Sequence, residues 1–302
     1  MTEQISEKIT LFAEPIRHFG SFVVTNSLLT SWVAVAIIIV LSLVLRSKLK
    51  TIPGKLQNVF EIIVEGALGL CDQVTNDRAL SMKIFPIAIS VFFFILISNW
   101  LGIMPLGGFG IVEKGLPAVA GGTSSLTFVP FLRGATADIN TTLALATMAV
   151  LGANLFGVVS IGIWKTFNKY VNLKVLGGIF TKIRHEPTII IVAPITFFVG
   201  LIEIVGEFAK IASLSFRLFG NVFAGEVLLA SMAALVAYFV PIPFLFLELL
   251  VGVIQALIFS ILLVVYFTIA ASDHDEHEHE PARNATHSVA GGEIKESIII
   301  SN

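Results

Sequence analysis

The feature that most constrains the fold is an apolar stretch, residues 188–240, that is far longer than one membrane crossing requires. A membrane-spanning helix needs about 20 consecutive, mostly apolar residues. A helix much longer than the bilayer is thick must tilt strongly or be buried in protein. The stretch also holds five ionisable side chains, namely Glu203, Glu207, Lys210, Arg217 and Glu226. It therefore predicts a long, strongly tilted helix that carries polar groups into the bilayer.

The composition of the whole chain is that of a membrane protein. Its 302 residues are 56% hydrophobic and only 13% charged, and the mean hydropathy is +0.91. Soluble domains carry about 25% charged residues. The single cysteine, Cys71, gives no disulfide framework and fits a small buried residue. No basic start runs into a short apolar core with a cleavage site, so we expect no cleavable signal peptide.

The hydropathy pattern predicts a membrane domain over residues 28–271. We expect five membrane helices, at about 28–45, 84–106, 138–164, 188–240 and 244–271, the third with Thr136 or Asp138 as its N-cap. Residues 56–80 mix apolar and acidic positions and predict an interfacial amphipathic helix. The expected fold class is an all-α polytopic membrane protein whose last two helices form a long, strongly tilted hairpin.

The charges of the loops predict how the chain is oriented. Residues 46–55 hold four Lys or Arg and residues 165–184 hold five, whereas residues 107–135 hold only Lys114 and Arg133. Cytoplasmic loops carry the excess of basic residues. With five crossings, the N-terminal segment 1–27 is then outside and the C-terminus is cytoplasmic.

Residues 272–302 differ in kind from the membrane domain. They open with the charge run "SDHDEHEHE" and hold four of the six histidines. Such a run predicts a disordered, solvated cytoplasmic tail. The histidines are compatible with weak metal binding, but we predict neither a metal site nor a cofactor.

The ionisable residues of the long stretch fall into a pattern on a helix. At about 100° per residue, four side chains lie within roughly 40° of Arg217 and form one polar stripe with it: Glu203, Lys210, Ser213 and Asn221. Glu226 faces the other way. An arginine cannot lose its charge in lipid, and placing one near a bilayer centre costs about 2.5–3.5 kcal/mol on insertion scales. A functional reason for Arg217 is therefore expected.

The depth of these residues follows from the orientation. The long helix runs outward, so Glu203 and Lys210 lie in the inner half, Arg217 near the middle and Glu226 in the outer half. In the returning helix, Glu248 lies near the outer start, and Gln255 lies closer to the middle. The sequence thus predicts two polar regions at different depths, with a fixed positive charge between them. This describes a discontinuous path for a cation or proton.

Simpler interpretations of these polar residues are alternatives to a path for a cation or proton. Glu203, Glu207 and Lys210 could form a local ion-pair cluster, or the helix could lie partly in the interface. Gly220 and Gly225 permit close approach of another helix but could merely be packing residues. Because so many ionisable residues occur in two consecutive apolar segments, a functional path is the preferred interpretation.

Four sequence stretches carry a resemblance to a known family. "SLSFRLFGNVFAGE" (213–226) and "LLVGVIQALIFSILLVVYFTIA" (249–270) resemble the a subunit of F-type ATP synthases, and so do "TADINTTLALA" (136–146) and "NWLGIMP" (99–105). The resemblance covers most of residues 81–271.

The resemblance implies a non-catalytic stator subunit without a nucleotide site. It implies two offset half-channels that pass protons to and from the carboxylates of a rotating c-subunit ring, against which the hairpin packs, so that proton flow drives rotation and ATP synthesis. The implied partners are the c-ring, the b-subunit peripheral stalk, the soluble ATPase head and the lipid bilayer, without nucleic acid. The implied location is a bacterial plasma (inner) membrane, in which the chain is a multi-pass protein.

The resemblance also implies roles for individual residues. Arg217 matches the arginine that faces the ring carboxylate, with Asn221 in support. The outer path is implied to use Glu226, Glu248, Gln255 and Asn99, and the inner path Glu203, Lys210 and Ser213. The chain departs from the pattern in two places. Both outer acids are Glu where members often pair Glu with His, and Gly102 stands where some members carry Asp.

Two other classes of protein were considered. An independent cation or proton transporter or channel would usually show internal repeats or broken helices, and the sequence shows neither. An intramembrane enzyme would need a nucleophile–base pair or a metal constellation, and the sequence has no HExxH, GxSxG or P-loop motif. Co-purification with ring and ATPase subunits would separate the stator from both.

Overall fold

The computed structural model describes residues 5–6, 13–19, 22–50, 54–103, 110–114, 126–130, 132–163, 189–235 and 239–272. The basic loop at 165–184 and nearly all of the predicted tail lie outside the described residues. Within them, five helices are long and apolar enough to cross a membrane. The chain is therefore an all-α polytopic membrane protein, as the sequence predicts.

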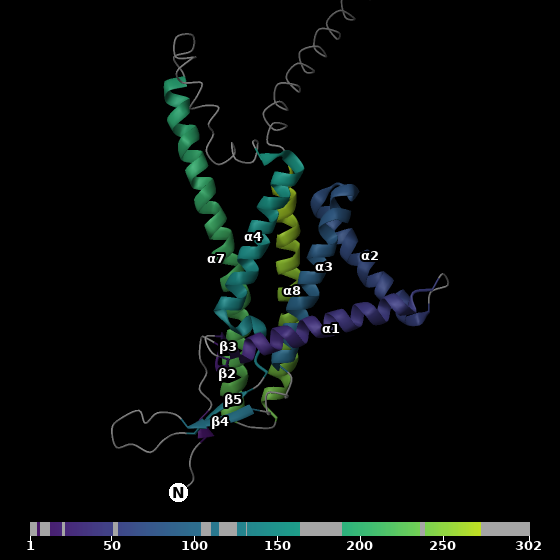
Figure 1. Ribbon diagram of the computed structural model, residues 1–302, viewed down its shortest axis with the longest axis vertical. Helices are drawn as coiled ribbons and strands as arrows, with labels where there is room; N and C mark the ends of the chain where they lie inside the picture. The colour runs from purple at the N-terminus through teal and green to yellow at the C-terminus, as the bar shows by residue number, and fades with distance from the viewer. Residues whose placement is uncertain are drawn as a thin grey trace, which may run out of the picture.

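Six long helices make up most of the described structure (Figure 1). They are α1 (Asn26–Lys48), α2 (Lys55–Thr75), α3 (Arg78–Ile103), α4 (Ile139–Ile161), α7 (Ile189–Leu235) and α8 (Pro241–Ala271). A short 3-10 turn, η2 (Ala135–Ala137), leads into α4. The amphipathic helix α2 is the one that does not meet the criteria of a membrane span.

The helix ends follow local side-chain chemistry. Thr25 caps α1 by accepting a hydrogen bond from the Leu28 backbone N–H, and Asp138 caps α4 by accepting one from Asn140. Asn76 ends α2 in the left-handed conformation, with φ at 52°, which asparagine tolerates better than most residues. As a result, residues 78–80 belong to α3 and not to the amphipathic helix. The helix α8 begins at Pro241 rather than at Phe244, because proline is well tolerated in the first turn of a helix.

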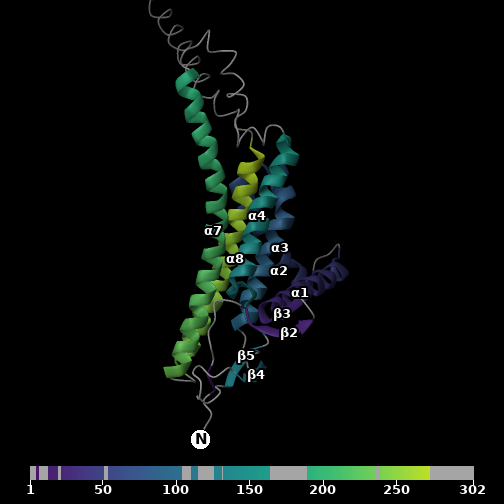
Figure 2. The same ribbon diagram turned by 60° about the vertical axis from the view of Figure 1, so that its left-hand side comes forward.

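Short strands occur near the N-terminus and in the segment between α3 and α4, where the sequence analysis expected none. The strands β1 (Ile5–Ser6), β5 (Leu126–Pro130) and β4 (Gly110–Lys114) form a sheet in that order, with β1 parallel and β4 antiparallel to β5. The strands β2 (Pro15–Phe19) and β3 (Phe22–Thr25) form an antiparallel hairpin directly before α1. These strands lie at the end of the bundle that also holds the turn between α7 and α8 (Figures 1 and 2).

The core lies between α3, α4, α7 and α8. Its largest fully buried side chains are aliphatic and come from all four helices: Ile84, Ile95, Val150, Leu214, Leu218, Leu263 and Val264. Gly157 brings α4 close to α8, because a Cβ at this position would lie 2.6 Å from the Ala270 carbonyl oxygen. Ser260 ties α8 to α3 by donating a hydrogen bond to the Ala88 carbonyl oxygen at 2.8 Å. The bundle is therefore held mainly by apolar packing.

The helix α1 lies across the bundle, whereas α4 and α8 run along its length (Figure 1). The helix α7 has 47 residues, which corresponds to about 70 Å at 1.5 Å per residue. The hydrocarbon core of a bilayer is only about 30 Å thick. A helix of this length must tilt strongly in the membrane or be partly buried in protein, and its tilt stays a prediction.

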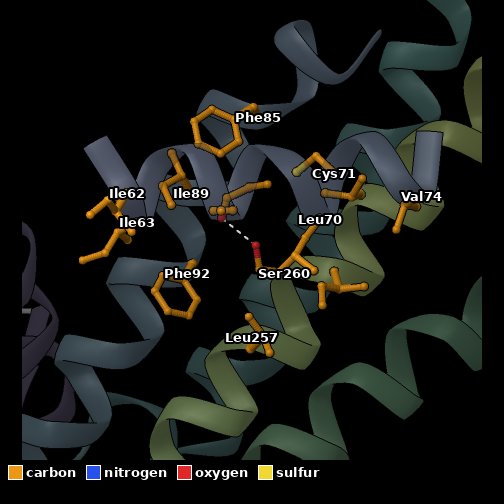
Figure 3. A pocket seen from close by; sticks show the side chains of 15 residues that line it. Ile62, Ile63, Leu70, Cys71, Val74, Phe85, Ile89, Phe92, Leu257 and Ser260 are labelled. Carbon is orange, nitrogen blue, oxygen red and sulfur yellow. Dashed lines mark hydrogen bonds between the residues drawn. The ribbon is translucent and has the colours of Figure 1, made fainter. Parts of the chain in front are cut away.

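An apolar cavity of about 260 Å³ lies between α2, α3 and α8 (Figure 3). The Cys71 thiol lines it together with apolar side chains that include Leu70, Phe85 and Phe92. Cys71 is a free cysteine and only 7% exposed, as the sequence predicts for a small buried residue. Burial, and to a smaller extent the neighbouring Asp72 carboxylate, raises the pKa of the Cys71 thiol.

We expect Cys71 to react slowly with thiol reagents near neutral pH. The thiolate is the reactive form, and a raised pKa lowers its fraction at any pH below that pKa. The alkylation rate should therefore rise with pH, but at a higher pH than for an exposed thiol. The matched control is Gln73→Cys in a Cys71→Ser background, because Gln73 is exposed on the same helix. Equal alkylation rates for the two thiols at pH 8 would contradict the expectation.

Candidate functional site

Arg217 lies on an exposed face of α7. One of its terminal nitrogens, Nη2, lies 3.5 Å from Ser213 Oγ, and the Asn221 side-chain amide donates to the Arg217 carbonyl oxygen at 2.9 Å. All three side chains are exposed. In the part of the chain that the structure describes, no carboxylate pairs with the Arg217 guanidinium. The charge therefore points away from the bundle.

The surface around Arg217 is made of small residues. A Cβ at Gly206 or Gly220 would meet no atom of the chain within 4 Å. Ala209 and Ala224 are also exposed on α7. Small residues of this kind let the backbones of two membrane helices approach closely. This face of α7 can therefore accept another helix against Arg217.

Glu248 lies near the start of α8, on the side that faces α7. It is only 8% exposed. Gly225 makes room for it, since a Cβ at 225 would collide with the Glu248 carboxyl carbon and both of its oxygens. Glu226 follows Gly225 directly and is within electrostatic range of Glu248. The structure thus brings the two predicted outer acids together.

Glu226 forms an ion pair with Arg133, which precedes η2. Arg133 Nη2 and Nε lie 3.0 and 3.1 Å from Glu226 Oε2, and Nε lies 3.5 Å from Oε1. Arg133 is 8% exposed, so the pair is largely shielded from solvent. Sequence reasoning counted Arg133 only as a loop charge and missed this contact.

Asn99 lies beside the same region, at the end of α3. Its side-chain amide donates to the Gly252 carbonyl oxygen of α8 at 3.4 Å, and its oxygen accepts a hydrogen bond from the Thr136 hydroxyl. Asn99 is 2% exposed. Gln255 is half-buried on α8, one turn beyond Gly252. The residues predicted for the outer path therefore lie at the end of α3, in the last part of α7 and in the first half of α8.

The segment 136–142 supplies further buried polar groups that sequence reasoning did not assign. The Asp138 carboxylate accepts hydrogen bonds from the hydroxyls of Ser27 and Thr141, both at 3.4 Å. The hydroxyls of Thr142 and Ser215 lie 3.2 Å apart and join α4 to α7. The polar run "TADINTT" just before an apolar helix was the available signal, but it served only as a helix start and as part of the family resemblance, without roles for its polar side chains.

A second polar cluster lies further toward the start of α7. Lys210 Nζ lies 2.7 Å from Glu207 Oε1, and the Asn154 amide of α4 donates to Glu207 Oε2 at 3.2 Å. Lys210 Nζ also lies 5.4 Å from the ring centre of Tyr266 on α8. Glu203 is half-buried one turn earlier. The Glu207–Lys210 pair matches the local ion-pair alternative, and it turns Lys210 toward the bundle instead of along the exposed stripe with Arg217.

The two polar clusters are separated along α7. Lys210 and Glu226 are seven and nine residues from Arg217, which places them about 10 and 13 Å away along the helix axis. Within the described residues, no three His, Cys, Asp or Glu side chains form a candidate metal site. The arrangement therefore consists of two internal groups of titratable side chains and one outward-facing cation between their levels.

Comparison with known proteins agrees with this arrangement. The model of the family described as ATP synthase A chain matches residues 28–268. A curated relative named ATP synthase subunit a from Syntrophobacter fumaroxidans is 31% identical over 270 residues, which cover 88% of this chain and 91% of the relative. One of the same name from Mycobacterium marinum is 34% identical over 263 residues, covering 85% and 91%. One from Gloeobacter violaceus is 31% identical over 252 residues, covering 83% and 86%.

These matches extend over nearly the whole membrane domain, including α3, α4, α7 and most of α8. A family model that matches this much of the chain, together with relatives above 30% identity, leaves no competing assignment. The chain therefore belongs to the ATP synthase A chain family.

Proposed function

We propose that this chain forms two offset half-channels that pass protons to and from the carboxylates of a c-subunit ring. Proton flow is thereby coupled to rotation and to ATP synthesis in the attached ATPase head. The chain is non-catalytic in this proposal and acts as part of the stator, together with the b-subunit peripheral stalk.

The observation that carries the proposal is the position of Arg217. Its guanidinium lies on the exposed, small-residue face of α7, whereas the acidic side chains of the outer path lie inside, against α8. A ring helix seated on this face would bring its carboxylate next to a fixed positive charge. The internal acids would remain available to exchange protons with water.

The chemistry follows from the cost of burying charge. A ring carboxylate that faces lipid must be neutral, because removing an ionised carboxylate from water is unfavourable. Beside Arg217 the opposite charge favours the ionised form, so the proton is released there. The same guanidinium repels cations that would otherwise cross directly from one half-channel to the other.

The two internal clusters supply the half-channels in this proposal. Glu226, Glu248, Asn99 and Gln255 belong to the outer path, and Glu203, Lys210 and Ser213 belong to the inner one. Glu207 joins the inner group, because it holds the Lys210 ammonium and is itself bound by Asn154. Asn221 supports Arg217 through its hydrogen bond to the arginine backbone.

The proposed orientation keeps the N-terminus outside and the C-terminus in the cytoplasm of a bacterial plasma membrane. The end of α4, the start of α7 and the end of α8 lie at one end of the bundle, and the turn between α7 and α8 lies at the other (Figures 1 and 2). The end that carries the basic segment 165–184 is the cytoplasmic one in this proposal.

The test is affinity purification of the chain from membranes, followed by reconstitution of the purified complex into vesicles. We expect ring and ATPase subunits to co-purify, and ATP to drive proton uptake that a ring-carboxylate inhibitor stops. A chain that purifies without ring subunits and still conducts protons in vesicles would instead be an independent transporter or channel. Omitting sodium from the assay distinguishes proton from sodium coupling.

A further inference from the structure

We propose that Arg133 is a positioning residue of the outer path, where it keeps Glu226 ionised so that Glu248 alone takes up and releases the proton. This inference rests on the proposed function. It goes further in two ways. It assigns different roles to Glu226 and Glu248, which the proposed function places together in the outer path. It also adds Arg133, which comes from a different part of the chain.

The first support is the geometry of the ion pair. Two guanidinium nitrogens of Arg133 lie within 3.1 Å of one Glu226 oxygen, across a sequence separation of 93 residues. A guanidinium remains charged at any biological pH. A carboxylate held by such a partner in a shielded site is strongly favoured in its charged form. Glu226 is therefore the less suitable of the two acids to carry a proton.

The second support is the contrast with the surroundings of Glu248. The α3 side chains that bond the α8 backbone next to Glu248 are neutral: Asn99 donates to the Gly252 carbonyl oxygen, and the Trp100 indole N–H donates to the Leu249 carbonyl oxygen at 3.3 Å. From α7 it is faced by the Gly225 backbone and by the Glu226 carboxylate. Two neighbouring carboxylates do not readily ionise together. Because Arg133 holds Glu226, the proton shared by the pair belongs on Glu248.

The third support explains how Arg133 reaches this position. A Cβ at Gly102 would lie 2.5 Å from Gly134 Cα and 2.7 Å from Gly134 N. Because Gly102 has no side chain, the backbone of Gly134, the residue after Arg133, can lie in this space. In this chain the segment that carries Arg133 therefore occupies the space that a side chain at position 102 would need.

The experiment measures the pH profile of ATP-driven proton pumping in vesicles for variants of the intact complex. In Arg133→Gln, Glu226 loses its cation and competes with Glu248, so the pair holds its proton up to a higher pH. We expect the pH of half-maximal pumping to rise by about one unit or more. Adding Glu226→Gln to this variant should remove the rise. Arg133→Lys keeps the charge and should leave the profile close to that of the parent.

A second comparison keeps the test decisive if Arg133→Gln fails to assemble. The double variant Arg133→Gln/Glu226→Gln removes both charges but retains Glu248, so it should pump faster than Glu248→Gln. Glu248→Gln should lower pumping at least about tenfold, since a positioned acid or base typically contributes 10²–10⁴-fold. Arg78→Gln is the control, because it breaks an exposed ion pair with Asp72 far from this region.

Two outcomes would overturn the inference. One is a double variant that loses pumping as completely as Glu248→Gln. The other is a lower maximal rate in Arg133→Gln without any change in the pH profile, which would make Arg133 a structural residue only. Neither outcome affects the proposed function, which is tested separately on the parent complex and on Arg217.

Discussion

Replacement of Arg217 by alanine is expected to abolish both ATP-driven proton pumping and ATP synthesis while the complex still assembles. The arginine side chain lies exposed on α7 and, among the described residues, bonds only Ser213 of the same helix, so we expect its removal to leave the packing of the bundle unchanged. In the proposed mechanism, what is lost is the cation that promotes proton release from the ring carboxylate. The measurements are proton uptake and ATP synthesis in vesicles, with co-purification of the ring as the test of assembly.

Arg217→Lys should fail almost as completely. A lysine can lose its proton when it is buried, and its ammonium lacks the planar fork of the guanidinium. Ser231→Ala is a suitable control, because Ser231 is exposed on the same helix and its hydroxyl bonds only the Val227 carbonyl oxygen. Robust coupled ATP synthesis in either arginine variant would exclude the proposed mechanism.

The second large effect is expected from Gly225→Ala. The added methyl group would occupy the position of the Glu248 carboxylate. This carboxylate ends a flexible side chain, so it can move away without separation of the two helices. We therefore expect normal assembly but a loss of proton pumping of about tenfold or more, because an acid–base group must be positioned within hydrogen-bond reach of its partners.

Gly152→Ala is the matched control for this substitution. Gly152 is also a helical glycine of the membrane domain, but a Cβ there would make only ordinary contact with the Phe267 ring, at 3.5 Å. Alanine is better than glycine in a helix by roughly 0.5–1 kcal/mol, so this variant should assemble and pump like the parent. Parental pumping in Gly225→Ala would show that the position of Glu248 is not critical.

The sequence was sufficient to predict an all-α polytopic membrane protein and the long helix α7. Both depend on local hydropathy and length, which are properties of a continuous segment. The N-cap at Asp138 was predictable for the same reason, because capping involves neighbours in the sequence. The break at Asn76 was missed, although the four consecutive polar residues 75–78 around it were an available turn signal.

The pairing of Glu226 with Glu248 could be anticipated, but the pairing of Glu226 with Arg133 could not. The first follows from two consecutive antiparallel helices, for which residue counting gives the relative depth. The second joins positions 93 residues apart through a segment without regular periodicity. The direction in which the Lys210 side chain points could not be predicted from the sequence either. Helical angles place it near Arg217, but its long side chain turns toward Glu207 and Tyr266.

The contacts between α4 and α7 have a mechanical consequence. In the proposed function, a ring that turns against the Arg217 face would drag α7 sideways with each step. Two polar links resist this shear, one between Thr142 and Ser215 and the other between Asn154 and Glu207. Directional hydrogen bonds oppose sliding, whereas a smooth apolar interface would yield more easily. These hydrogen bonds therefore hold α7 against α4. In the proposed function, torque would pass from α7 into the rest of the stator without displacement of the Arg217 charge.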